Sequence, residues 1–338
     1  MEPDSEYNPS AVGIQGSIFG LPFKEEEADI IIIPVPWDVT VSYNEGTADG
    51  PDAILNASPQ LDLEIPDSEA PWKQGIWMAP IDQNIREKSR TLRAKVNSYI
   101  QELESRYSNP DLSQVLVSIN EATESLKEEV KATTLSHLSA GKKTGLVGGD
   151  HSCPLGYIEA LAETYGSFGI LQIDAHMDLR NTYEGFTHSH ASIMYNALQL
   201  SEVTQLIQVG IRDYCEEEVD VTQSDDRIST FYDLRLKDRI YSGESWKSIC
   251  SDIISGLPDK VYVSFDIDGL RPSFCPGTGT PVPGGLDYDE ALFLIRQVRS
   301  SGRQIIGFDL CEVAPQDHDK EWNANVGARI LYALCGLL

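Results

Sequence analysis

The sequence has no CxxC pair, no apolar run long enough to cross a bilayer, and only 26 basic residues against 53 acidic ones. Six scattered cysteines predict neither a thiolate metal site nor a disulfide framework, so we expect reduced packing thiols in a cytoplasmic protein. The longest apolar run near the start covers residues 30–35, whereas a membrane helix needs about 20 residues. The first residues are acidic and polar, unlike a secretory signal. Membrane insertion and secretion are therefore not expected.

The acidic surplus gives a net charge of −27. It opposes nucleic acid as a partner, because the phosphates would be repelled. It is compatible with a small cationic substrate, although we expect most of the charge to lie on the solvated surface.

The chain of 338 residues also lacks internal repeats, low-complexity tracts and linkers rich in proline, glycine or serine. Strand and helix patterns alternate along it, which predicts an α/β fold with a parallel sheet covered by helices on both faces. We expect an N-terminal arm at 1–27 and a single domain at 28–338. The predicted strands are 28–35, 144–147, 168–173, 203–209, 228–231, 260–265 and 304–308; the predicted helices are 51–57, 84–108, 111–140, 154–165, 191–200, 246–255, 288–299 and 323–334.

The most informative stretch comes directly after the apolar run at 168–173. Asp174, His176 and Asp178 lie at i, i+2 and i+4, and ligands of such sheets bind beyond the carboxyl ends of the strands. Ionised carboxylates at the end of a core strand are costly unless something cationic holds them. A divalent metal is the obvious candidate.

Similar side chains follow three other predicted strands. They are His151 after 144–147, Asp266 and Asp268 after 260–265, and Glu312 after 304–308. Each alone could be a helix cap or a loop hydrogen-bonder. Likewise, Asp150 could simply cap a turn, and Asp309 would point away from the edge if its strand alternates.

Together, however, six of these side chains form a carboxylate and imidazole set without thiolate: His151, Asp174, His176, Asp178, Asp266 and Asp268. That set suits Mn²⁺ and, less exclusively, Zn²⁺, Fe²⁺, Co²⁺ or Ni²⁺. Six ligands are too many for one open catalytic ion but suit two ions that share carboxylates. Paired ions about 3.5–4 Å apart can generate a nucleophile from water near neutral pH.

Three segments resemble the signatures of the ureohydrolase superfamily, which contains arginases, agmatinases, guanidinases and formimidoylglutamases. They are GGDHS at 148–152, DAHMD at 174–178 and SFDIDGLRPSFCPGTGTPVPGG at 264–285. The likeness covers about residues 28–335. It implies a three-layer α/β/α sandwich around a mainly parallel eight-stranded sheet, a hydrolase of linear amidines, and a homo-oligomer, either a trimer or a hexamer.

The resemblance also implies the roles of single residues. The site would hold two divalent ions, most often Mn²⁺ and in some guanidine-hydrolysing members Ni²⁺. One ion would bind His151, Asp174, Asp178 and Asp266, and the other Asp174, His176, Asp266 and Asp268, so that Asp174 and Asp266 bridge. Glu312 would pair with the amidino group, His190 would pass a proton to the leaving amine, and Thr280 would line the pocket. His188 is the competing proton shuttle.

The loop at 179–186 bears on the substrate. It does not match the loop with which arginases hold the amino-acid end of arginine, although Arg180 and Asn181 remain candidate substrate contacts. Asp178-Leu179-Arg180 resembles formimidoylglutamases, in which an arginine could meet a substrate carboxylate. Retention of His190 instead favours a guanidino substrate whose leaving group needs a proton.

Aromatic residues and one departure from the family pattern complete the site prediction. Tyr183, Phe186 and Trp322 could shrink the pocket or could be packing residues. Arg271 stands where the third signature usually has an acid that is not a metal ligand, so metal binding should survive. We predict an agmatinase-like or guanidinase-like enzyme, with formimidoylglutamase or arginase as alternatives. Outside the family's chemistry, the chain could be a non-catalytic metal-binding regulatory subunit.

Overall fold

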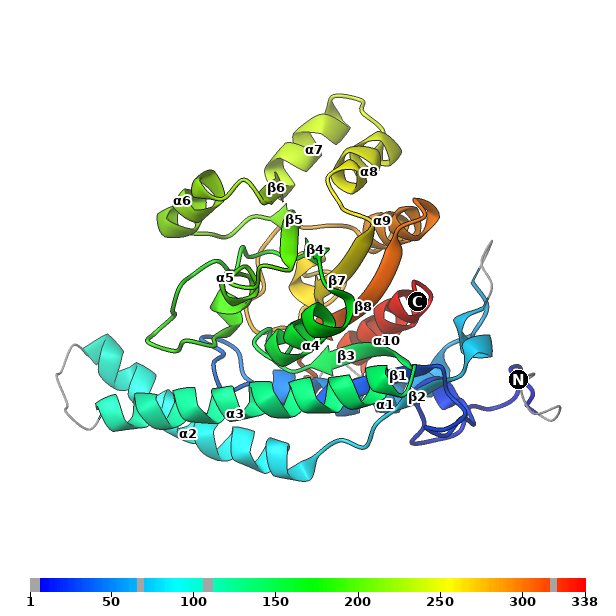
Figure 1. The fold of residues 1–338 in the computed structure, drawn as a ribbon, viewed down its shortest axis with the longest axis horizontal. Helices are drawn as coiled ribbons and strands as arrows, with labels where there is room; N and C mark the ends of the chain where they lie inside the picture. The colour runs from blue at the N-terminus through cyan, green and yellow to red at the C-terminus, as the bar shows by residue number, and fades with distance from the viewer. Residues whose placement is uncertain (1–6, 66–69, 106–111, 317–320) are drawn as a thin grey trace.

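A single parallel sheet organises the molecule (Figure 1). The structure, a computed structural model, describes residues 7–65, 70–105, 112–316 and 321–338. Every pair of neighbouring strands in the described chain is parallel, and the strand order is β2-β1-β3-β8-β7-β4-β5-β6. The predicted eight-stranded α/β sheet is thus confirmed. Its strands are β1 (Ile30–Val35), β2 (Ile76–Met78), β3 (Lys143–Gly148), β4 (Phe168–Ile173), β5 (Val203–Ile211), β6 (Ile228–Tyr232), β7 (Lys260–Asp266) and β8 (Gln304–Cys311).

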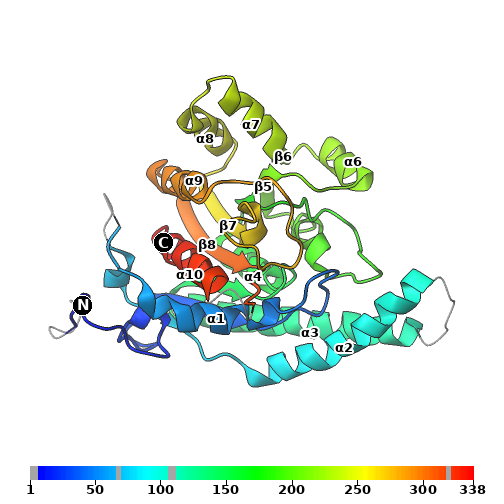
Figure 2. The same cartoon turned by 180° about the vertical axis from the view of Figure 1, so that it is seen from behind.

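Helices cover both faces because the central strands are apolar on both sides, as β1 and β4 show by being buried throughout. One apolar core lies under α1, α8, α9 and α10, and the other under α2, α3, α4 and α5. Figure 1 has α3 and α4 in front of the sheet, and Figure 2, from behind, brings α1 and α10 to the front. The helices are α1 (Gly50–Ala57), α2 (Gln83–Ser105), α3 (Leu112–Ser139), α4 (Leu155–Tyr165), α5 (Ile193–Ala197), α6 (Glu216–Ser224), α7 (Asp233–Tyr241), α8 (Trp246–Ser255), α9 (Tyr288–Ser300) and α10 (Trp322–Cys335).

The sequence-based element boundaries differ from the structure in a few places. Strand β2 and helices α6 and α7 were not predicted. The predicted helix at 191–200 is a short 3₁₀ turn, His190–Ser192, followed by α5. Strand β8 runs on to Cys311, so Asp309 lies inside the strand. The predicted helical residues 106–108 and 111 lie outside the described residues.

Two further features of the fold lie outside the sheet. The long helices α2 and α3 pack side by side and reach beyond the strands in both views (Figures 1 and 2). Before β1, Ile18 and Phe19 are buried, and the Phe19 ring lies 4.9 Å from that of Tyr332 in α10. None of the described helices combines the length and apolarity that a membrane span requires.

Candidate metal centre

The predicted ligands leave four strands that are direct neighbours in the sheet, β3, β8, β7 and β4. His151 follows β3, Asp174 follows β4, Asp266 ends β7, and Glu312 follows β8. Because parallel strands end at the same edge, segments more than a hundred residues apart in the chain meet there. Asp174, Asp266 and Glu312 are at most 3% exposed, so the carboxylates lie in the interior.

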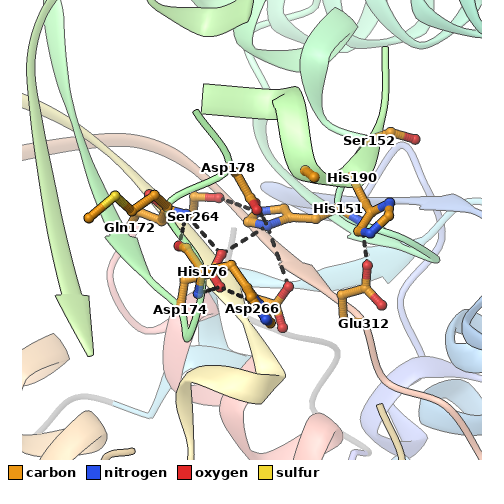
Figure 3. Close-up of polar contacts among 12 residues, drawn as sticks. His151, Ser152, Gln172, Asp174, His176, Asp178, His190, Ser264, Asp266 and Glu312 are labelled. Carbon is orange, nitrogen blue, oxygen red and sulfur yellow. Dashed lines mark hydrogen bonds and ion pairs between the residues drawn. The ribbon is translucent and has the colours of Figure 1, made fainter. Parts of the chain in front are cut away.

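The first ligand group surrounds the Nδ1 atom of His151 (Figure 3). Carboxylate oxygens of Asp178, Asp174 and Asp266 lie 2.9, 3.1 and 3.4 Å from it. His151 Nδ1 is buried and makes no hydrogen bond within the described chain. A nitrogen lone pair facing three carboxylates is the arrangement that a shared cation would satisfy.

The second group surrounds Nδ1 of His176. Asp268 Oδ2 lies 3.1 Å from this atom and Asp174 Oδ1 lies 3.6 Å from it. Asp174 therefore faces His151 with Oδ2 and His176 with Oδ1. The donor atoms of His151, Asp174 and Asp178 lie within 4.8 Å of one another, as do those of Asp174, His176 and Asp268. Asp174 belongs to both groups, as a bridging ligand must.

The backbone holds the carboxylates in these orientations. The amides of His176 and Asp268 donate to the preceding acids, Asp174 Oδ1 at 2.7 Å and Asp266 Oδ1 at 2.8 Å. Ala175 N donates to Asp268 Oδ1 at 3.0 Å. Each of these carboxylates thus has one oxygen tied to the backbone, which fixes its orientation at the centre.

Crowded buried charge shifts the pKa values in the way an unfilled cation site would. Burial raises the pKa of Asp178 to about 7, and the neighbouring Asp174 charge adds to the effect. Burial and then the Asp268 and Asp174 charges hold the pKa of Asp266 well above its ordinary value. Burial lowers the pKa of His151, but the close Asp174 and Asp178 carboxylates outweigh it and leave this pKa well raised. The raised pKa values favour positive charge at this place, whether it comes from protons or from metal ions.

The residues therefore fit a pair of divalent ions. Oxygen and imidazole nitrogen donors without thiolate suit ions such as Mn²⁺. The buried acids Asp174, Asp178, Asp266, Asp268 and Glu312 carry more negative charge than one divalent ion can neutralise. The shared carboxylate of Asp174 places the two ligand groups next to each other.

Glu312 adds a buried carboxylate that belongs to neither of the two ligand groups. Its Oε1 accepts the amide of His151 at 2.9 Å, while Oε2 is buried and makes no hydrogen bond within the described chain. Gly279 faces it, and a Cβ there would lie 2.6 Å from Oε2, so a larger residue would displace the carboxylate. Burial and the Asp150 charge hold the pKa of Glu312 well above its ordinary value. An unpaired, enclosed carboxyl group can receive N–H donors from a ligand.

His190 and His188 have different surroundings. His190 is 9% exposed, its Nε2 lies 3.4 Å from Ser42 Oγ, and its ring meets the Tyr183 ring edge-on at 5.8 Å. Burial lowers the pKa of His190 to about 3. His188 instead places Nδ1 3.4 Å from Glu124 on α3. The packing against helix α3 favours a structural role for His188.

The chain has recognisable relatives. A family model described as the arginase family matches residues 28–76 and 65–336. The chain belongs to the arginase family. The ureohydrolase membership predicted from the three motifs is thereby confirmed, and the motif positions carry the ligand groups described above.

Sequence relatives in the arginase family include ureohydrolases of agmatine type. N(1)-aminopropylagmatine ureohydrolase of Synechocystis sp. is 32% identical over 294 residues, covering 86% of this chain and 82% of the relative. The Thermus thermophilus protein of the same name is 30% identical over 319 residues, covering 92% and 91%. Agmatinase of Neisseria meningitidis is 30% identical over 309 residues, covering 90% and 86%.

Solved structures agree on the fold. Proclavaminate amidino hydrolase from Streptomyces clavuligerus has a TM-score of 0.75 at 22% identity and covers 98% of both chains. Agmatine ureohydrolase of Thermoplasma volcanium has a TM-score of 0.70 at 22% identity and covers 95% of this chain and 94% of its own. These likenesses support the arginase fold.

The predicted substrate loop is only partly at the site. Arg180 lies 3.8 Å from Glu218 with its Nε, and its guanidinium lies 4.7 Å from the Tyr183 ring. Asn181 is exposed. Thr280 lies next to the metal centre, because its Oγ1 is 3.5 Å from Asp268 Oδ2.

The remaining residues singled out from the sequence lie away from the ligand groups or pack in the core. Phe186 is fully buried with its ring 5.5 Å from that of Tyr99, which makes it a packing residue. Trp322 is 52% exposed and donates to the Phe274 carbonyl at 2.7 Å. Arg271 pairs with the half-exposed Asp287 at 3.2 Å, so its positive charge is engaged outside the ligand groups.

Sequence reasoning missed the residues that orient the ligands. His151 Nε2 lies 2.8 Å from Ser264 Oγ and 3.7 Å from Asp309 Oδ1, an arrangement that leaves Nδ1 for a metal. Gln172 Nε2 donates to Asp174 Oδ2 at 2.8 Å. The available signal was a polar residue inside an otherwise apolar strand, since a buried polar group requires a partner. Asp150, considered above as a turn cap, is fully buried and accepts from Thr40 and Ser152.

Proposed function

We propose that the chain hydrolyses a guanidino compound of agmatine type, in which a guanidinium group is attached to an alkyl amine, and releases urea. The observation that carries the proposal is the shared carboxylate of Asp174 between two ligand groups, with the unpaired Oε2 of Glu312 at the same edge. The sequence relatives named for agmatine and aminopropylagmatine support the choice of substrate class.

We infer that the metals are two Mn²⁺ ions, with Ni²⁺ as the alternative, because the donors are carboxylates and imidazoles. When bound, such ions would supply a nucleophile from water near neutral pH and stabilise the charge of the tetrahedral intermediate. The residues that would hold them are His151, Asp174, His176, Asp178, Asp266 and Asp268.

Glu312 would orient the substrate. The guanidinium group offers N–H donors in a plane, and a carboxylate binds such a fork by paired charge-assisted hydrogen bonds. The free Oε2 is suited to this because Oε1 is already held by His151 N. Ion pairing with the cation would also lower the raised pKa of Glu312 and favour its charged form.

His190 would move the proton. The low pKa keeps its imidazole neutral near pH 7, so it would carry a proton only transiently between the attacking water and the leaving nitrogen. Water adds to the guanidinium carbon, the bond between that carbon and the alkyl-bearing nitrogen breaks, and urea forms. His190 then gives its proton to the leaving nitrogen, because an amine leaves poorly unless protonated. The nearby Ser42 hydroxyl and the Tyr183 ring would keep the imidazole oriented.

The contacts of Arg180 favour a substrate without a carboxylate at the loop. Its guanidinium is engaged by Glu218 and stacks on Tyr183, so the feature that resembled formimidoylglutamases has a partner within the protein. The net charge of −27 would attract a cationic amine chain rather than an anionic one.

The test is a urea-release screen with Mn²⁺-loaded protein over agmatine, N1-aminopropylagmatine, guanidine, guanidinobutyrate and arginine, with formamide release assayed on formimidoylglutamate. We expect the highest kcat/KM on agmatine or its aminopropyl derivative. The Asp174→Ala variant is the blank. Two metals per chain with no urea from any compound would instead favour the non-catalytic scaffold.

A further inference from the structure

Polar residues form one row across five neighbouring strands, just below the metal centre. Thr230 of β6 is register-paired with Gln208 of β5, Gln208 with Gln172 of β4, Gln172 with Ser264 of β7, and Ser264 with Asp309 of β8. Apart from Thr230, which is half-buried, these residues are fully buried. Side chains at paired positions of parallel strands point to the same face, so the row is continuous.

The part of the row on β6, β5 and β4 is a chain of hydrogen bonds that ends on Asp174. Thr230 Oγ1 donates to Gln208 Oε1 at 2.8 Å, Gln208 Nε2 donates to Gln172 Oε1 at 2.7 Å, and Gln172 Nε2 donates to Asp174 Oδ2 at 2.8 Å. The same two amide nitrogens also donate to backbone carbonyls of the ligand loop, Gln172 to His176 at 3.2 Å and Gln208 to Met177 at 2.8 Å.

The donor-to-acceptor direction of these hydrogen bonds is fixed by Asp174, on which they end. An ionised Asp174 can only accept, so Gln172 must present its NH₂ group to it and its oxygen to Gln208. Gln208 must then donate to Gln172, and its own oxygen must accept from Thr230. Reversing any amide would place two acceptors or two donors against each other in the buried sheet.

We propose that Gln172 and Gln208 are positioning residues of the metal centre, which rests on the proposed function of that centre. Asp174 must offer one oxygen to each ligand group, and a carboxylate free to rotate would do so only part of the time. Gln172 holds Oδ2 from below while the amide of His176 holds Oδ1 at 2.7 Å. Gln208 fixes the rotamer of Gln172 and the Met177 carbonyl. Loss of such outer partners typically weakens metal affinity by about 10–100-fold.

The first test measures the affinity of metal-depleted protein for Mn²⁺ by equilibrium dialysis and elemental analysis. We expect Gln172→Leu and Gln208→Leu to weaken Mn²⁺ binding, by about 10-fold or more for Gln172→Leu. The matched control is Gln205→Leu, the same substitution on the same strand, β5. Gln205 is half-buried and lies an odd number of residues from Gln208, so its side chain faces the other side of the sheet. Wild-type affinity in both Gln172→Leu and Gln208→Leu would overturn the proposal.

A second variant tests the direction of the hydrogen bonds, and it does not require the buried sheet to accommodate a leucine. In Gln208→Glu, an ionised Glu accepts only, so Gln172 must turn its NH₂ group away from Asp174 and present its oxygen instead. Protonated Glu can donate as the amide does. We therefore expect the affinity deficit relative to wild type, measured at each pH, to close as the pH falls. A deficit that is the same at every pH would contradict the directional role.

These outcomes separate the inference from the proposed function. If the wild-type protein binds two Mn²⁺ but releases no urea, the proposed function is wrong, and the Mn²⁺ affinities of the variants still decide the positioning role of Gln172 and Gln208. If the wild type is active and both variants bind Mn²⁺ as it does, only the positioning role is wrong. A wild type that binds neither Mn²⁺ nor Ni²⁺ would overturn both.

Discussion

At the residue scale, two of the acids at the site stand in a backbone conformation that non-glycine residues avoid. Asp178 has φ of 56° and Glu312 has φ of 67°. Each such residue costs about 1–3 kcal/mol and persists only where surrounding structure holds it. Here the Asp178 carboxylate reaches His151 Nδ1 and Glu312 reaches His151 N. Backbone strain at two acids that converge on one histidine agrees with selection for the site.

His190 can be separated from the metal ligands by mutation. Replacing His190 with Ala should lower kcat by about 10²–10⁴-fold, the usual contribution of a proton-transfer group, while the metal content stays at the wild-type value. Asp174→Ala should lose both activity and bound metal, because Asp174 belongs to the two ligand groups. Steady-state kinetics and elemental analysis of the same preparations measure the two effects.

The matched control for that comparison is His188→Ala, which should keep most of the activity because its imidazole pairs with Glu124. Full activity of the His190→Ala variant would transfer the proton shuttle to His188 or to water. Unchanged metal content in Asp174→Ala would contradict its bridging role.

At the element scale, the long α2 and α3 pair holds loops on two sides of His190. From α2, the Arg93 guanidinium donates to the carbonyls of Val39 and Val41, next to the Ser42 hydroxyl that lies 3.4 Å from His190 Nε2. Arg93 is only 7% exposed, so its charge serves the loop rather than the solvent. A helix pair that lies outside the sheet thus contributes to the geometry of the site.

Asn120 of α3 offers a test of this support. Its Nδ2 donates to Gly185 O at 3.3 Å, and its Oδ1 accepts from Thr187 N at 3.1 Å. Asn120→Ala should free the loop, at a cost of about 0.5–1.5 kcal/mol per hydrogen bond at most, and lower kcat/KM several-fold with unchanged metal content. Asn120→Asp keeps the acceptor for Thr187 but sets a carboxylate oxygen against the Gly185 carbonyl, so it should not recover the wild-type kcat/KM. If kinetics show equal kcat/KM for wild type and Asn120→Ala, α3 does not support catalysis.

The elements that the sequence reveals are those with strong patterns. Strand β4 is an uninterrupted apolar run, and its ligands follow it directly, so both were predicted. Strand β2 has three residues, too few for a pattern. Helix α7 has few apolar residues and buries only Asp233 and Leu236, so little in its sequence marks it as a core helix. The role of Gln172 cannot be predicted from the sequence, because its contact with Gln208 depends on which strands are neighbours. The alternation of strands and helices along the chain does not determine that order.

At the scale of the whole molecule, acidic charge is distributed in two different ways. Most of the 53 acidic residues are outside the core, where water and salt screen them. The acids of the metal centre are buried side by side, where repulsion is strong and solvation is lost. The metal-free fold therefore carries an electrostatic cost at one place, and the metals that relieve it should stabilise the whole chain.

This cost predicts how metal-dependent stability varies with pH. Without metal, the folded pKa of Asp178 is about 7, against about 3.9 in an unfolded chain. Between about pH 4 and 7 Asp178 therefore binds more protons in the folded state than in the unfolded state, and its contribution to metal-free stability falls as the pH rises through this window. The raised pKa values of Asp266 and His151 act in the same direction, His151 above about pH 6.5. Metals must displace these protons to bind.

The increase in Tm caused by Mn²⁺ should therefore grow from about pH 5.5 to about pH 8. Saturation at about 100 times Kd corresponds to about 2.7 kcal/mol of added stability. Thermal melts of metal-depleted protein with and without Mn²⁺, in buffers that do not chelate, measure the increment. Asp174→Ala should show little increment at any pH, because it loses the ligand that both groups share. An increment that shrinks with rising pH would mean that the buried acids do not hold the metal.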